Sequence, residues 1–78
     1  MDTLEIQNLE IDYTKLEYAR KEKGLSQTDV AKALNLDRRQ IWQYENGKAL
    51  PLENFTKLMM FYGKSIEFFL KTATNKIA

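Results

Sequence analysis

Three side chains near the middle of the chain, Arg38, Arg39 and Gln43, can each form paired hydrogen bonds with a planar polar partner. At offsets 0, 1 and 5 they would share one face of a helix, opposite Ile41 and Tyr44. An arginine can bind the O6 and N7 atoms of guanine together, and a glutamine can bind N6 and N7 of adenine. The pattern is compatible with contact to base edges and equally with a solvated, charged surface.

The remaining residue types argue against most other chemistry. The chain has no cysteine and no histidine, so it lacks a disulfide framework and the commonest metal ligand and general base. It also has no glycine-rich phosphate loop, and no pair of carboxylates stands apart from solvated helix faces. We therefore predict no enzymatic activity, no metal and no cofactor.

The elements that would position these side chains are helices with clear starts and ends. Three capping residues each precede an acidic or amide side chain by three positions: Thr14, Ser26 and Asp37. Ser65 offers a fourth start, and three glycines follow helical stretches: Gly24, Gly47 and Gly63. The pattern predicts five helices, at about residues 15–23, 27–34 and 38–45, from about residue 52, and after residue 65.

Apolar side chains at helical spacing predict the core of one small domain. The positions expected to point inward are Tyr13, Leu16, Ala19, Val30, Ala31, Leu34, Ile41, Tyr44, Leu52, Phe55, Leu58, Met59, Tyr62, Ile66, Phe69 and Leu70. The second and third helices would have only about two turns each, so they can be stable only when docked on that core.

The first twelve residues follow a different pattern. Two copies of Leu-Glu-Ile place Leu4, Ile6, Leu9 and Ile11 in alternation with acidic residues, as in an edge strand. We expect an arm that pairs with another chain or covers a groove, a frayed tail packed loosely on the domain, or an added piece of helix. The predicted organisation is an arm or tail at 1–12, a domain at 13–72 and a tail at 73–78.

The charge is nearly balanced, at a net +1, but it is unevenly distributed. Residues 1–14 carry −4, residues 15–48 carry +3 and residues 49–78 carry +2. A mild basic bias in the centre is compatible with a nucleic-acid partner without requiring one. No apolar run is long enough to cross a bilayer and no secretory signal is evident, so we predict a cytoplasmic protein without a membrane partner.

The segment 25–48 contains two short helices joined by a four-residue connection at 35–38, with the small Ala31 where the helices must cross. Its ordered anchors are Arg20, Leu25-Ser26-Gln27, Val30-Ala31, Leu34, Ile41, Glu45, Gly47 and Gly63-Lys64-Ser65-Ile66. This set resembles the Cro and lambda-repressor class of helix-turn-helix regulators, also called the xenobiotic-response-element family, over roughly residues 13 to 70. The resemblance implies an all-α, compact five-helix lambda-repressor-like domain that binds double-stranded DNA through its third helix.

The resemblance also implies roles for individual residues. The base-reading residues would be Arg38, Arg39 and Gln43, and the residues that contact the DNA backbone would be Gln27, Gln40, Asn46 and Lys48. For Gln27 the alternative is an ordinary exposed first-turn residue, and for Gln40 it is the cap of its own helix. Arg20 and Glu45 resemble the ion pair of the family, whose role would be structural.

Two positions depart from the pattern of the family. Trp42 stands on the flank of the third helix, where small polar residues are common in the family. It would contact a thymine methyl group or a sugar, or else pack against the fourth helix or a neighbouring subunit. Pro51 comes one residue later than usual and Leu52 replaces a polar helix start, which leaves the conformation of the loop at 48–52 open.

The resemblance predicts a transcriptional regulator that acts as a dimeric repressor on an inverted repeat with half-sites about one helical turn apart. A homodimer is expected because one reading helix buries little surface, and its interface would include Met60, Phe61 and Phe68. Alternatively, those three side chains cover the underside of the core or pack beneath the arm. The other functional hypothesis is an antitoxin or adaptor that uses the same fold to bind a toxin or another protein.

Overall fold

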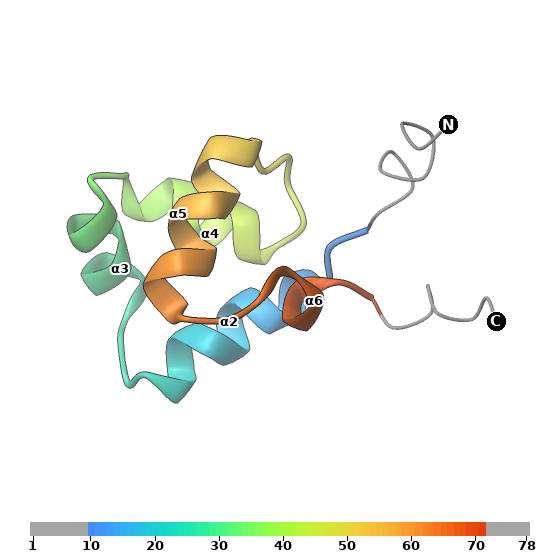
Figure 1. Ribbon diagram of the computed structural model, residues 1–78. Coiled ribbons are helices and arrows are strands. Elements are labelled where there is room, and N and C mark those ends of the chain that lie inside the picture. The colour runs from blue at the N-terminus through green and yellow to red at the C-terminus, as the bar shows by residue number, and fades with distance from the viewer. Residues whose placement is uncertain (1–9, 72–78) are drawn as a thin grey trace, which may run out of the picture.

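The computed structural model describes residues 10–71 of the 78-residue chain. Within that part all regular structure is helical (Figure 1), and the five helices are α2 (Tyr13–Glu22), α3 (Gln27–Leu34), α4 (Arg38–Glu45), α5 (Leu52–Tyr62) and α6 (Ile66–Phe69). The prediction of an all-α, five-helix fold is confirmed. None of these helices is long and apolar enough to cross a membrane.

The starts of the central helices follow from their capping residues. Ser26 Oγ accepts the Asp29 backbone N–H at 3.0 Å, and Asp29 Oδ2 accepts the Ser26 N–H at 2.9 Å. At the start of α4, Gln40 Oε1 likewise accepts the Asp37 N–H at 2.9 Å. These contacts satisfy N–H groups that would otherwise lack an acceptor in the first helical turn.

The start of the first described helix was wrongly predicted. α2 begins at Tyr13, with Asp12 as its N-cap, rather than at Lys15 behind Thr14. Asp12 Oδ1 accepts both the Thr14 backbone N–H, at 3.1 Å, and the Thr14 hydroxyl. An aspartate caps at least as well as a threonine, and here the threonine serves as its donor. The hydroxyl bond is the largest of the contacts that lower the pKa of Asp12.

The core contains ten buried apolar side chains drawn from all five helices: Leu16, Ala19, Val30, Ala31, Ile41, Tyr44, Phe55, Leu58, Tyr62 and Phe69. All ten were expected to point inward. Two further expectations are wrong, because Leu52 is 77% exposed and Ile66 is 43% exposed. Both are the first residues of their helices, and a helical side chain is directed toward the preceding turn, which is missing there.

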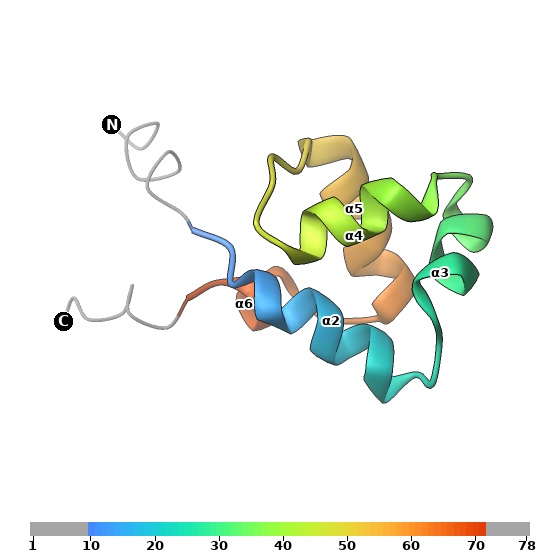
Figure 2. The ribbon, with the colours of Figure 1, turned by 180° about the vertical axis from the view of Figure 1, so that it is seen from behind.

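The packing of the helices leaves one side of α4 uncovered. α4 packs against α3 and α2, and α2 packs against α6. Seen from behind, α4 lies in front of α5 at the outside of the bundle (Figure 2). The edge-to-face contact between Phe55 and Phe69, with ring centroids 5.6 Å apart, joins α5 to α6.

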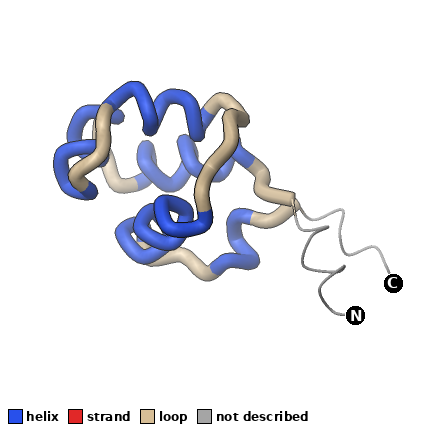
Figure 3. Tube along the Cα trace, turned by 90° about the horizontal axis from the view of Figure 1, so that it is seen from above, coloured by secondary structure: helices blue, strands red, loops and turns tan. Residues whose placement is uncertain are grey.

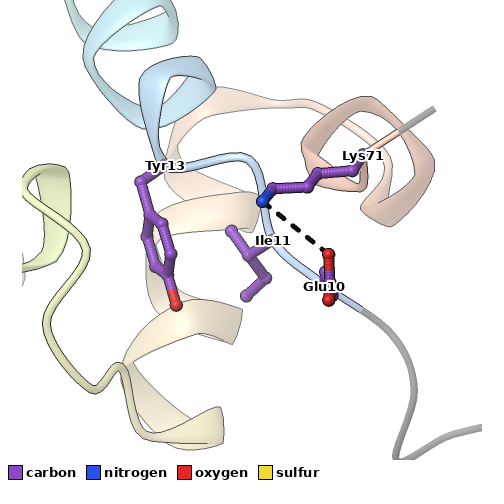
Figure 4. A pocket seen from close by; sticks show the side chains of 4 residues that line it. All are labelled: Glu10, Ile11, Tyr13 and Lys71. Carbon is purple, nitrogen blue, oxygen red and sulfur yellow. Dashed lines mark ion pairs between the residues drawn. The ribbon is translucent and has the colours of Figure 1, made fainter. Parts of the chain in front are cut away.

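The two ends of the described chain meet at the end of the molecule opposite α3 (Figure 3). Ile11 forms an isolated antiparallel bridge with Leu70, and Asp12 N–H donates to the Phe69 carbonyl at 2.7 Å. Beside this bridge, Glu10, Ile11, Tyr13 and Lys71 line a hollow of about 360 Å³ (Figure 4). The expected arm residues Leu4, Ile6 and Leu9 lie outside the described residues, and so does the tail at 73–78.

Candidate nucleic-acid interface

The turn between α3 and α4 fixes the angle at which α4 leaves the bundle. Asn35 ends α3 in the left-handed conformation, with φ 59° and ψ 45°. The Leu36 N–H then donates to the Ala31 carbonyl at 2.8 Å and closes the turn. Ala31 itself is buried between the helices, where a larger side chain would hold them apart.

The side chains of α4 divide into an inward and an outward set. Ile41 and Tyr44 are buried in the core. The outward set consists of the exposed Arg38, Arg39 and Trp42 and the half-buried Gln43. The structure therefore brings the three predicted base-reading residues to one uncovered surface, which also carries Trp42.

A buried ion pair holds the C-terminal end of α4 against α2. Arg20 Nε lies 2.7 Å from Glu45 Oε2, and Nη2 donates to Glu45 Oε1 at 3.0 Å. The two side chains are only 10% and 4% exposed. The remaining guanidinium nitrogen Nη1 donates to the Leu25 carbonyl at 3.0 Å, so Arg20 also fixes the turn before α3. Hydrogen bonding to Glu45 raises the pKa of Arg20, which keeps its charge at any ordinary pH.

Gln27 extends this ion pair toward the outward face of α4. Its Nε2 donates to Glu45 Oε1 at 3.1 Å, and its Oε1 accepts from Arg38 Nη1 at 3.4 Å. The two partners fix the orientation of the amide, because a carboxylate only accepts and a guanidinium only donates. This link connects the buried Arg20 to the exposed Arg38 through Glu45 and Gln27, and no pattern in the sequence indicated it.

Two of the predicted backbone-contacting residues already have roles within α4. Gln40 caps the helix through the Asp37 N–H, and its Nε2 lies 3.5 Å from the Tyr44 hydroxyl. Asn46 Nδ2 donates to the Trp42 carbonyl at 2.8 Å and closes the end of the helix. Contact of either residue with DNA stays a prediction, and only the second amide hydrogen of each is left to donate.

The charges around α4 leave a positive surface. Within residues 10–71 the side chains of Arg39 and Lys48 have no hydrogen-bond or ion-pair partner, and Arg38 has only the amide of Gln27. Two nearby carboxylates are occupied: Glu45 binds Arg20, and Asp29 caps α3, where its backbone bond to Ser26 lowers its pKa. The outward arginines thus keep free donors for an external anion or base.

The three side chains predicted for a dimer interface do not form one exposed patch. Met60 is 72% exposed on α5. Phe61 is half-buried beside Tyr62, with ring centroids 5.6 Å apart. Phe68 is half-buried between the ammonium groups of Lys15 and Lys64, at 4.9 and 5.0 Å from its ring centroid. The dimer interface stays a prediction, in which Met60 is the most accessible of the three residues.

Comparison of the chain with known protein families gives a match that fits this geometry. The helix-turn-helix family model matches residues 16–69, which include all of α3 and α4 and the turn between them. No curated protein and no solved structure matches the chain. Because the family match covers more than half of the chain, this protein belongs to the helix-turn-helix family of the Cro and lambda-repressor type, whose domains bind DNA.

Proposed function

We propose that this protein is a sequence-specific transcriptional regulator, and in particular a repressor, that inserts α4 into the major groove of duplex DNA. The observation that carries the proposal is the outward face of α4, where Arg38 and Arg39 have no acidic partner among the described residues. The eight residues of α4 span about 12 Å, which suits a groove of about that width. Arg38, Arg39 and Gln43 would bind the base edges.

The start of α3 supports the proposal as a site for a phosphate group. The backbone N–H groups of Gln27 and Thr28 have no acceptor within their own helix. They lie at the positive end of the helix dipole, next to the Gln27 amide that contacts Arg38. A phosphate bound there would fix the register of α4 along the groove, while Lys48 would contact the backbone beyond the other end of α4.

Binding as a homodimer would supply the affinity and the mode of repression. One α4 helix reads only a few base pairs, so a second copy on an inverted repeat would multiply the specificity. Two domains on adjacent turns would also cover enough of a promoter to exclude the transcription machinery. Within this proposal the exposed Met60 is the first residue to test as part of the contact between copies.

Selection of bound duplexes from a random pool, followed by gel shift at several salt concentrations, tests this function. The wild type should select a defined sequence, and Arg38→Ala/Arg39→Ala should bind all duplexes weakly and without discrimination. The matched control is Lys21→Ala/Lys23→Ala, which removes two exposed positive charges from the region of α2 and should retain the selected sequence. Failure of the wild type to select any sequence would contradict the proposal.

One observation favours a second candidate function. Leu52 and Met60 on α5 are 77% and 72% exposed, which is unusual for apolar side chains in a small domain and typical of a protein contact. An antitoxin or adaptor would use such a surface to bind a toxin or another protein. Retention of DNA selectivity in Leu52→Ser/Met60→Ser, together with loss of a co-purifying partner, would support this additional role.

A further inference from the structure

Trp42 lies between Arg38 and Arg39 on the outward side of α4. At about 100° per residue, Trp42 lies about 40° from Arg38 and about 60° from Arg39 around the helix, and thus between them. Its side chain is among the large exposed apolar groups, at 45% exposure. Gln43 is half-buried by comparison. A surface that both arginines contact would therefore lie close to the indole ring.

The indole ring forms no hydrogen bond within the described part of the chain. The one side-chain hydrogen bond to Trp42 in residues 10–71 reaches its backbone, whose carbonyl accepts from Asn46 Nδ2 at 2.8 Å. No aromatic or cation contact of the ring occurs among those residues. Whatever the covered part of the ring packs against, 45% of the side chain stays exposed. A large exposed apolar surface on a polar helix face favours an external apolar contact.

The floor of the major groove offers one apolar group, the C5-methyl of thymine. We propose that Trp42 is a specificity-determining residue that packs its indole on such a methyl group. Trp42 lies three and four residues beyond the arginines, which is about 4.5–6 Å along the helix. With base pairs about 3.4 Å apart, the thymine lies within about two base pairs of a guanine bound by Arg38 or Arg39. This inference rests on the proposed function and extends it from arginine-guanine pairs to an adjacent thymine.

Deoxyuridine substitution tests the contact, because uracil differs from thymine only by the missing methyl group. Each thymine of the selected duplex is replaced in turn, and the dissociation constant is measured for wild type and for Trp42→Ala. Loss of one methyl contact should weaken wild-type binding about fourfold at one position in each half-site. Trp42→Ala should bind the thymine duplex more weakly and lose its sensitivity to deoxyuridine at that position. The matched control is Ile66→Ala, which removes an apolar side chain of similar exposure, 43%, from α6 and should keep the wild-type profile.

The fluorescence of the protein provides a second measurement that needs no substitution. Trp42 is the only tryptophan of the chain, so its emission reports on this position alone. Addition of the selected duplex should quench or shift the emission, and the deoxyuridine duplex should do so less at equal saturation. An emission shift that follows protein concentration without DNA would place the indole in a contact between copies and overturn the proposal.

The outcomes separate the two proposals. If no duplex is selected, the proposed function fails, and the role of Trp42 fails with it. If a duplex is selected but no deoxyuridine position matters, or if the effect persists in Trp42→Ala, only the role of Trp42 is overturned. Circular dichroism should give the same helix content for Trp42→Ala as for the wild type, which shows that the variant is folded.

Discussion

Two buried polar groups, the guanidinium of Arg20 and the hydroxyl of Tyr62, have different surroundings. The hydrogen bonds that the structure describes for the Arg20 guanidinium go to Glu45 or to the Leu25 carbonyl. The Tyr62 hydroxyl is buried nearby and has no hydrogen-bond partner among the described residues. The first group positions α4, and the second carries a desolvation cost without a compensating bond.

The ion pair predicts a non-additive response to mutation. Arg20→Met or Glu45→Met alone leaves one buried charge without its partner and should lower the free energy of unfolding by about 3–5 kcal/mol. The double variant removes both charges and should lose less than either single variant. Urea unfolding of the four proteins measures this cycle. If the losses of the two single variants add up to the loss of the double variant, Arg20 and Glu45 are not coupled.

Tyr62→Phe should leave stability unchanged at neutral pH or raise it by about 1 kcal/mol, because it removes an unpaired buried hydroxyl. Burial, and next the charge of Glu45, raise the pKa of Tyr62 above its ordinary 10.0. Since only the unfolded chain ionises easily, the stability tied to this group is complete below about pH 10 and declines above it. The wild type should therefore lose more stability than Tyr62→Phe between about pH 9 and pH 11. Equal alkaline losses in urea titrations would contradict this assignment.

The link from Glu45 through Gln27 to Arg38 can be tested by changing Gln27 alone. Gln27→Ala removes the support of Arg38 and the amide bound to Glu45, whereas Gln27→Glu places a carboxylate beside Glu45. We expect both to weaken binding to the selected duplex. The loss should be greater for glutamate, which also repels a phosphate at the start of α3. Tighter binding of the Gln27→Glu variant in a gel shift would exclude contact between this residue and the phosphate.

At the scale of elements, the helix starts that could be predicted are those set by capping contacts between residues close in the sequence. Ser26 with Asp29, and Asp37 with Gln40, mark the starts of α3 and α4 because capping acts within one turn of the chain. The start of α2 was missed because Thr14, the expected cap, lies two residues after Asp12, which is an equally good capping residue. The sequence showed no sign of the bond from Gln27 to Glu45, since 18 positions separate them and the contact exists only after α3 docks on α4.

The capping box of α3 should give the protein an acid-sensitive stability. Bonds with Ser26 lower the pKa of Asp29 below its ordinary 3.8, so the stability tied to this group is complete above that pH and is lost as the pH falls further. Asp29→Ala should lower the melting temperature at neutral pH, and the difference from wild type should shrink below about pH 3. The control is Glu53→Ala in the first turn of α5, whose carboxylate makes no hydrogen bond in residues 10–71. A pH-independent difference for Asp29→Ala would show that its charge is irrelevant.

At the scale of the whole molecule, one domain presents one uncovered helix face, that of α4. The ends of the described chain meet at the end of the molecule opposite α3 (Figure 1). An inverted repeat would place two α4 helices in successive major grooves on the same side of the duplex. The spacing of half-sites then becomes a geometric requirement.

The spacing between half-sites can be varied directly. Two half-sites about 10 base pairs apart, centre to centre, should bind two copies cooperatively, because both face the same side of the duplex. Inserting about five base pairs turns one half-site to the opposite side and should abolish cooperativity, while about ten should restore part of it. Met60→Glu should reduce cooperativity without changing the affinity for a single half-site, since it lies on α5, outside the reading helix. Sedimentation of the complexes counts the bound copies, and a cooperativity that ignores the spacing would exclude a symmetric dimer on DNA.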